Sequence, residues 1–164
     1  MDIQAILVLG HVLGTVLGLG GAIVAEVQVT QALRDGKIED DERALLHANY
    51  FLIRIGMALI IVSGLALIWW HLGQGHQWAL TSEKLWVKEI MVVVIIVNAV
   101  LLTKHWMPLA FGRSLSLVSW LGATVLGVWH TIPLGFFELL LVYAAVVLLV
   151  AFFFRAHAAR PRFR

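Results

Sequence analysis

The sequence predicts an all-α integral membrane protein, a single-domain bundle of five transmembrane helices over residues 1–164. Of the 164 residues, 61% are apolar and only 13% are charged, whereas a soluble domain is about half apolar and a quarter charged. So small a globule could not bury this excess of apolar side chains. Five apolar runs are also about as long as a bilayer is thick. The composition argues against a soluble enzyme, a nucleic-acid-binding protein and a disordered chain.

The first two expected helices are separated by the strongly charged segment 34–43. The first run has only Asp2 before it and is too long for a cleaved signal peptide. Asp40 and Asp41 are plausible N-caps for the second run. With ends placed to within about three residues, the expected helices cover residues 4–31, 44–70, 83–105, 114–131 and 134–155.

The last two runs are separated by Pro133 and Gly135, which either bend one long helix or divide it into two. Basic residues favour two helices. Five crossings leave nine Lys and Arg residues on one side and Lys84 alone on the other, which is the asymmetry that the positive-inside rule requires. We therefore expect the N-terminus outside and the C-terminus in the cytoplasm of a bacterial cell, with the chain in the cytoplasmic membrane. Five of the seven tryptophans then fall near the outer interface.

Seven ionisable side chains fall within the expected spans, where each charge costs about 2.5–3.5 kcal/mol at the helix centre. At 1.5 Å rise per residue, most of them reach a common level roughly 7–11 Å outside the midplane. This outer layer is the predicted site, whereas Arg54 with Glu26 or Asn98 forms an inner, structural pair. The seven residues are His11, Glu26, Arg54, Lys88, Glu89, His130 and Glu138.

His11 is the first candidate metal ligand. Its helical face continues through Thr15 and Gly18, with Gly14 nearby. These small residues leave room for a haem macrocycle, or they form a ridge that lets two helices pack closely. His130 is either the second axial ligand of the same haem or an interfacial residue at a helix end.

Lys88 and Glu89 are the candidate catalytic residues. Lys88 lies more than a turn inside the third expected helix, where it could hold a haem propionate, exchange protons with Glu89, or extend its ammonium group to the outer surface. Two further observations concern metals. Cysteine is absent, which excludes thiolate ligation and covalently attached haem. His71, His76 and His130 could bind a metal ion at the outer surface, although their spacing follows no known motif.

Two segments resemble a known family. Gly10-His11-Val12-Leu13-Gly14 and Leu85-Trp86-Val87-Lys88 resemble HemJ-type protoporphyrinogen oxidases and their relatives, which include CopD-like copper-resistance proteins and small five-helix membrane proteins. The resemblance extends over residues 5–105. It implies haem b as cofactor, with His11 and Lys88 at the family's two signature polar positions.

Three functions agree with these observations. The first is a haem-b-binding redox protein, with His11 and His130 as ligands, Gly14 and Gly18 beside the haem, and a quinol or tetrapyrrole as substrate. The second is transport of copper or a proton-coupled solute through the layer of His11, Lys88 and Glu138. The third is a non-catalytic membrane subunit. In each case the expected partners are the lipid bilayer and either further copies of the chain or a redox partner, and not nucleic acid.

Overall fold

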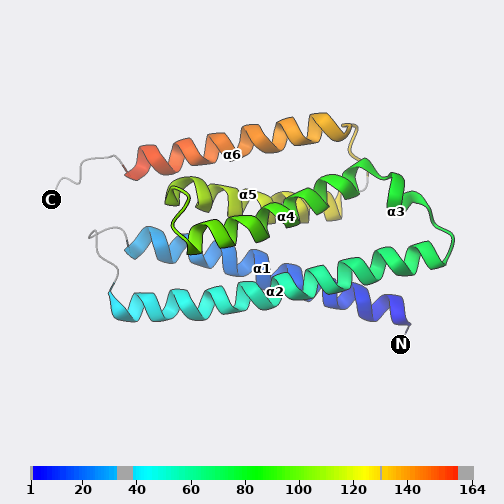
Figure 1. Ribbon diagram of the computed structural model, residues 1–164, viewed down its shortest axis with the longest axis horizontal. Helices are drawn as coiled ribbons and strands as arrows, with labels where there is room; N and C mark the ends of the chain where they lie inside the picture. Colours follow the sequence, from blue (N-terminus) through cyan, green and yellow to red (C-terminus); the bar gives the residue numbers. More distant parts are fainter. Residues whose placement is uncertain (1, 33–38, 130, 159–164) are drawn as a thin grey trace. The chain divides into compact units, whose positions relative to one another are not determined.

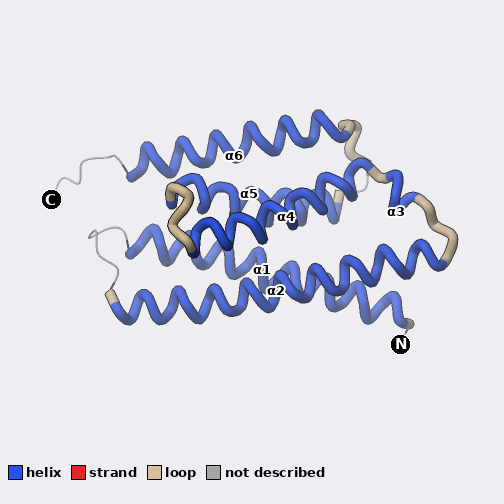
Figure 2. Tube along the Cα trace, in the orientation of Figure 1, coloured by secondary structure: helices blue, strands red, loops and turns tan. Residues whose placement is uncertain are grey.

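The computed structural model describes residues 2–32, 39–129 and 131–158, and within these ranges the regular structure is entirely helical, with no strand (Figures 1 and 2). Five of the described helices are long and apolar enough to cross a membrane, as the sequence predicts for a multi-pass membrane protein. The helices are α1 (Ile3–Ala32), α2 (Asp40–Gly73), α3 (Trp78–Thr81), α4 (Glu83–Thr103), α5 (Leu109–Val128) and α6 (Phe136–Ala158).

Pro133 and Gly135 lie in the loop between α5 and α6, so the prediction of two helices here, rather than one bent helix, is confirmed. Other boundaries differ from the prediction. The short helix α3 was not predicted, and α5 begins at Leu109 rather than residue 114. Pro108 precedes that first turn, and a proline there removes only a donor that the helix leaves unpaired. Arg113, which the sequence placed just before this helix, lies within it, and its side chain lies over the Phe154 ring of α6, 4.8 Å from the ring centroid.

The start of α2 also corrects the sequence-based prediction. Glu39 is the N-cap, and its N–H donates to Glu42 Oε2 at 3.0 Å. Asp40 and Asp41, the predicted caps, lie in the first turn of the helix. Their negative charges there still stabilise the helix N-terminus through its dipole.

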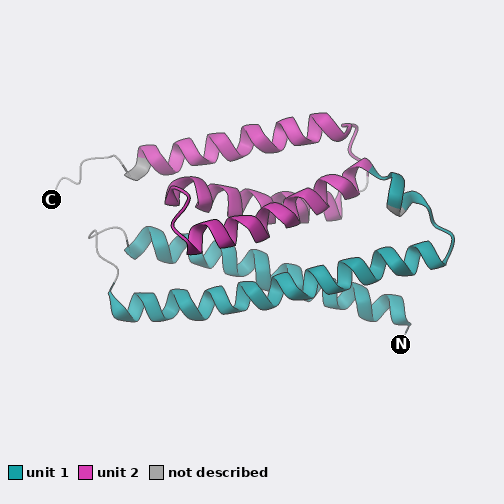
Figure 3. Cartoon of the chain, viewed as in Figure 1, with its two compact units in different colours: residues 1–82 teal, residues 83–164 magenta. Residues whose placement is uncertain are grey.

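The chain divides into two compact units, residues 1–82 and 83–164 (Figure 3). Unit 1 contains α1, α2 and α3, and unit 2 contains α4, α5 and α6.

In unit 1, α1 and α2 run antiparallel and cross with their backbones in direct contact (Figure 1). The contact is made by Gly14 and Gly18 of α1 and Gly56 of α2. A Cβ at Gly56 would lie 2.6 Å from the Gly18 nitrogen and 2.8 Å from the Gly14 oxygen. Hydrogen bonds lie on both sides of this contact: His11 to Ser63 on one, and Asn49 Nδ2 to the Gly21 carbonyl, at 2.8 Å, on the other.

Unit 2 has an apolar core of Val87, Met91, Leu126 and Leu139, contributed by all three of its helices. Two hydrogen bonds made by polar side chains also join helix to helix in this unit. Asn98 Nδ2 donates to the Gly112 carbonyl at 2.8 Å, which links α4 to α5. Ser119 Oγ and Tyr143 Oη are 2.7 Å apart, which links α5 to α6.

Replacement of Gly56 tests the close approach of α1 and α2. We expect Gly56→Ala to lower the free energy of unfolding by about 1–3 kcal/mol, the usual cost of overpacking, because the new methyl group meets backbone atoms that cannot rotate away. Thermal unfolding in detergent, followed by circular dichroism, measures this change. Gly20→Ala in α1 is the matched control, since a Cβ there meets nothing within 4 Å. Equal melting temperatures for the two variants would contradict the proposed role of Gly56.

Candidate functional site

The side chain of His11 is fixed by a short chain of hydrogen bonds from α1 to α2. His11 Nδ1 lies 3.0 Å from Ser63 Oγ, and Ser63 Oγ in turn donates to the Leu59 carbonyl one turn earlier in α2. A serine hydroxyl has one proton, and a carbonyl oxygen can only accept. Ser63 therefore accepts from His11, and we assign the proton of the neutral ring to Nδ1. This tautomer leaves the lone pair on Nε2.

The backbone around His11 holds the ring in that position. Ser63 is buried and His11 is half-buried. A Cβ at Gly64 would lie 3.5 Å from His11 Cε1 and 3.7 Å from Nδ1, so the Nδ1–Cε1 edge of the ring lies against α2. These distances are ordinary van der Waals contacts, so the ring edge packs directly against the α2 backbone at this position. A neutral imidazole fixed at Nδ1 by a second residue is the usual arrangement of a histidine that binds a metal through Nε2.

Gly14 and Gly18 do not leave open space beside His11 on the α2 side. Both are buried, and both pack against Gly56. The sequence allowed either room for a haem macrocycle or a ridge for close helix packing, and on this side of α1 the structure shows the close packing. We therefore assign these glycines to helix packing and do not place a cofactor over them.

Lys88 and Glu89 lie in α4 of unit 2, and both side chains are half-buried. A Cβ at Gly127 would lie 3.9 Å from Lys88 Nζ, so the ammonium group of Lys88 lies beside α5 where that helix has no side chain. Lys84, one turn earlier, donates to the Trp129 carbonyl at 3.1 Å. The level that Lys88 is predicted to share with His11 stays a prediction, because His11 belongs to unit 1.

Glu138, predicted in the same outer layer, caps a helix. Its Oε2 accepts from the Gly135 N–H at 3.0 Å, and Glu83 Oε2 accepts from the Phe136 N–H at 3.0 Å. Two carboxylates thus bind N–H groups at the start of α6, which would otherwise have no partner within the helix. These contacts give both glutamates a structural role.

The remaining predicted residues are described within their own units. The side chain of Arg54 is exposed on α2, and Glu26 accepts a hydrogen bond from Thr30 Oγ1 at 3.3 Å. Asn98 is buried and bonded within unit 2. His130 lies outside the described residues, so its role as a second axial ligand stays a prediction.

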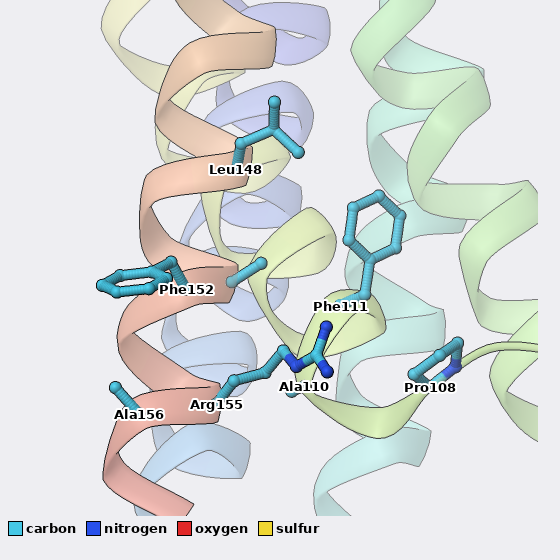
Figure 4. A pocket seen from close by; sticks show the side chains of 8 residues that line it. Pro108, Ala110, Phe111, Leu148, Phe152, Arg155 and Ala156 are labelled. Carbon is cyan, nitrogen blue, oxygen red and sulfur yellow. The ribbon is translucent and has the colours of Figure 1, made fainter.

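In the part of the chain that the structure describes, no three His, Asp or Glu side chains gather into a metal-binding group. An apolar groove of about 970 Å³ lies between the start of α5 and the end of α6, with Phe111 and Leu148 in its walls and Arg155 beside it (Figure 4). None of the predicted site residues lines this groove. Ser63, the hydrogen-bond partner of His11, was not among the residues singled out from the sequence, because it can be recognised only once α1 and α2 are aligned.

The chain was compared with protein-family models, with curated proteins and with solved structures. No family model, curated protein or solved structure matches it.

Glu83→Ala tests the cap of α6. We expect a loss of about 0.5–2 kcal/mol in the free energy of unfolding, the range measured for lost helix caps, because the Phe136 N–H loses its acceptor. Thermal unfolding in detergent measures it. Glu83→Gln keeps an acceptor oxygen and should retain most of the stability. If the alanine variant has the same melting temperature as the wild-type protein, the contact contributes nothing to stability.

Proposed function

We propose that this protein is a haem-b-binding redox protein of the membrane, with His11 as an axial ligand to the iron. The hydrogen bond from His11 to Ser63 is the observation that supports the proposal most. In the neutral ring it favours the tautomer that is protonated at Nδ1 and unprotonated at Nε2, and iron is bound through such an unprotonated nitrogen. The sequence resemblance at His11 to HemJ-type proteins points to the same cofactor.

The residues of unit 1 fit one axial ligand. His11 would supply the nitrogen, Ser63 would orient the ring, and the Gly64 backbone lies against the ring edge. Haem b would supply a centre that gains and loses one electron. The hydrogen bond to Nδ1 would increase electron donation from the ring to the iron, and so favour the oxidised state.

We further propose the setting of this function. Basic residues concentrate on one side of the five predicted crossings, which supports an outside N-terminus, a cytoplasmic C-terminus and residence in a bacterial cytoplasmic membrane. A quinol or a tetrapyrrole, both soluble in lipid or at its surface, is the class of reductant that a haem at this depth could oxidise.

The absorption spectrum of the purified protein tests the proposal. We expect protein that is expressed in cells supplemented with haem and then purified in detergent to show a Soret band that shifts when dithionite is added. His11→Ala should remove the band, whereas His47→Ala, a change of an exposed histidine on α2, should leave it. A colourless wild-type protein, or a full Soret band in the His11 variant, would contradict the proposal.

Ser63→Ala tests the role of the hydrogen bond separately. We expect haem affinity to fall about 10–100-fold, as happens when a metal ligand loses its outer hydrogen-bond partner, and the midpoint potential to rise. Ser63→Thr retains a hydroxyl and should restore the wild-type potential. The potential distinguishes ring orientation from simple loss of stability, because a merely less stable protein would bind less haem at an unchanged potential.

A further inference from the structure

Two histidines meet at the end of α2, in unit 1 and outside the site proposed above. His71 is in the last turn of the helix, and His76 follows it by five residues. Their Nδ1 atoms lie 3.4 Å apart, and their ring centroids lie 5.6 Å apart. His76 is exposed and His71 is partly exposed, so solvent ions can reach the pair.

The backbone itself brings these two rings together. The His76 N–H donates to the His71 carbonyl at 3.0 Å, and the Gly75 N–H donates to the Leu72 carbonyl at 3.0 Å. With Gly75 in the left-handed region at φ 78°, these bonds form a Schellman motif, which brings the residue after the glycine back to the last helical turn. The side chains at those two positions usually make an apolar contact. Here both positions hold imidazoles.

The separation of the two nitrogens suits a shared metal ion better than a hydrogen bond. Good N–H donors lie about 2.7–3.2 Å from their acceptors, and 3.4 Å is longer. Two nitrogens that each lie about 2.0–2.1 Å from a tetrahedral zinc ion are about 3.3–3.4 Å apart. The pair therefore already has the spacing of two ligands on one such ion.

A neighbouring aromatic ring limits the movement of the first histidine. The Trp78 ring, in α3, lies 4.8 Å from the His71 ring, centroid to centroid, at an angle of 58°. This contact reduces the number of positions open to His71, so less side-chain entropy is lost when an ion binds. It also places a fluorescent side chain beside the histidine pair.

We propose that His71 and His76 form a binding site for a divalent transition-metal ion of the zinc class. Two imidazole nitrogens suit zinc, nickel and copper, and not magnesium or calcium, which prefer oxygen ligands. Two protein ligands leave further positions for water or an incoming ligand, as in sites that exchange their metal. The site is independent of haem binding at His11.

Titration calorimetry with zinc chloride tests the site, using full-length protein purified without a polyhistidine tag. We expect His71→Ala and His76→Ala each to weaken one zinc site per chain by more than about tenfold, since even an outer partner of a metal ligand contributes about 10–100-fold to affinity. His47→Ala, the exposed histidine of the same helix, should bind as the wild type does. Magnesium chloride should give no binding. Unchanged zinc binding in a His71→Ala/His76→Ala double variant would overturn the proposal.

A second pair of variants tests the backbone motif without removing a ligand. Gly75→Ala forces a side chain into the left-handed region and should weaken zinc binding severalfold. Gly73→Ala is the matched control, because a Cβ there meets nothing within 4 Å and its backbone is helical. Copper(II) should quench part of the tryptophan fluorescence in the wild type, and Trp78→Phe should remove that part. Equal zinc affinity in both glycine variants would show that the motif does not position the ligands.

Discussion

The direct contact between the α1 and α2 backbones is the constraint on which the structure of unit 1 depends. Helices that lie in a bilayer gain little from the hydrophobic effect when they associate. Close packing and interhelical hydrogen bonds must therefore stabilise the pair. Gly14, Gly18 and Gly56 allow the close packing. Because the backbones touch there, a side chain as short as serine on α2 can reach the imidazole of His11 on α1. A wider crossing would separate these two groups.

The same contact explains how a polar site can exist in so apolar a pair of helices. A polar atom buried in an apolar helix pair is stabilised by a protein partner, since water is scarce inside a bilayer. The Ser63 hydroxyl donates a hydrogen bond to the Leu59 carbonyl within α2 and accepts one from His11 Nδ1. Asn49 bonds to the backbone of α1 on the other side of the crossing. Helix packing and the chemistry of the histidine are therefore consequences of one geometry.

Much of the fold could be predicted from the sequence, because a bilayer demands long apolar runs and Pro133 and Gly135 break the last of them. The cap at Glu39 could not, since it depends on a local hydrogen bond that hydropathy does not report. The early start of α5 could not either, because hydropathy treats the charge of Arg113 as a break, whereas the helix begins directly after Pro108. His11 was found because a histidine is rare in such a run. Its partner Ser63 was not, because the register between two helices depends on which glycines meet. Glu138 was predicted in the site from its depth alone, and depth does not reveal which N–H group a carboxylate accepts from.

The tautomer of His11 tests the central claim most directly, because both the hydrogen-bond geometry and the proposed ligation depend on it. The ¹⁵N chemical shifts of the imidazole, measured before haem is added in protein labelled at histidine and assigned by comparison with His11→Ala, distinguish protonated from unprotonated ring nitrogens. We predict a protonated Nδ1 and an unprotonated Nε2 in the neutral ring, and the reverse pattern in Ser63→Ala. A wild-type ring protonated at Nε2 would contradict the assignment.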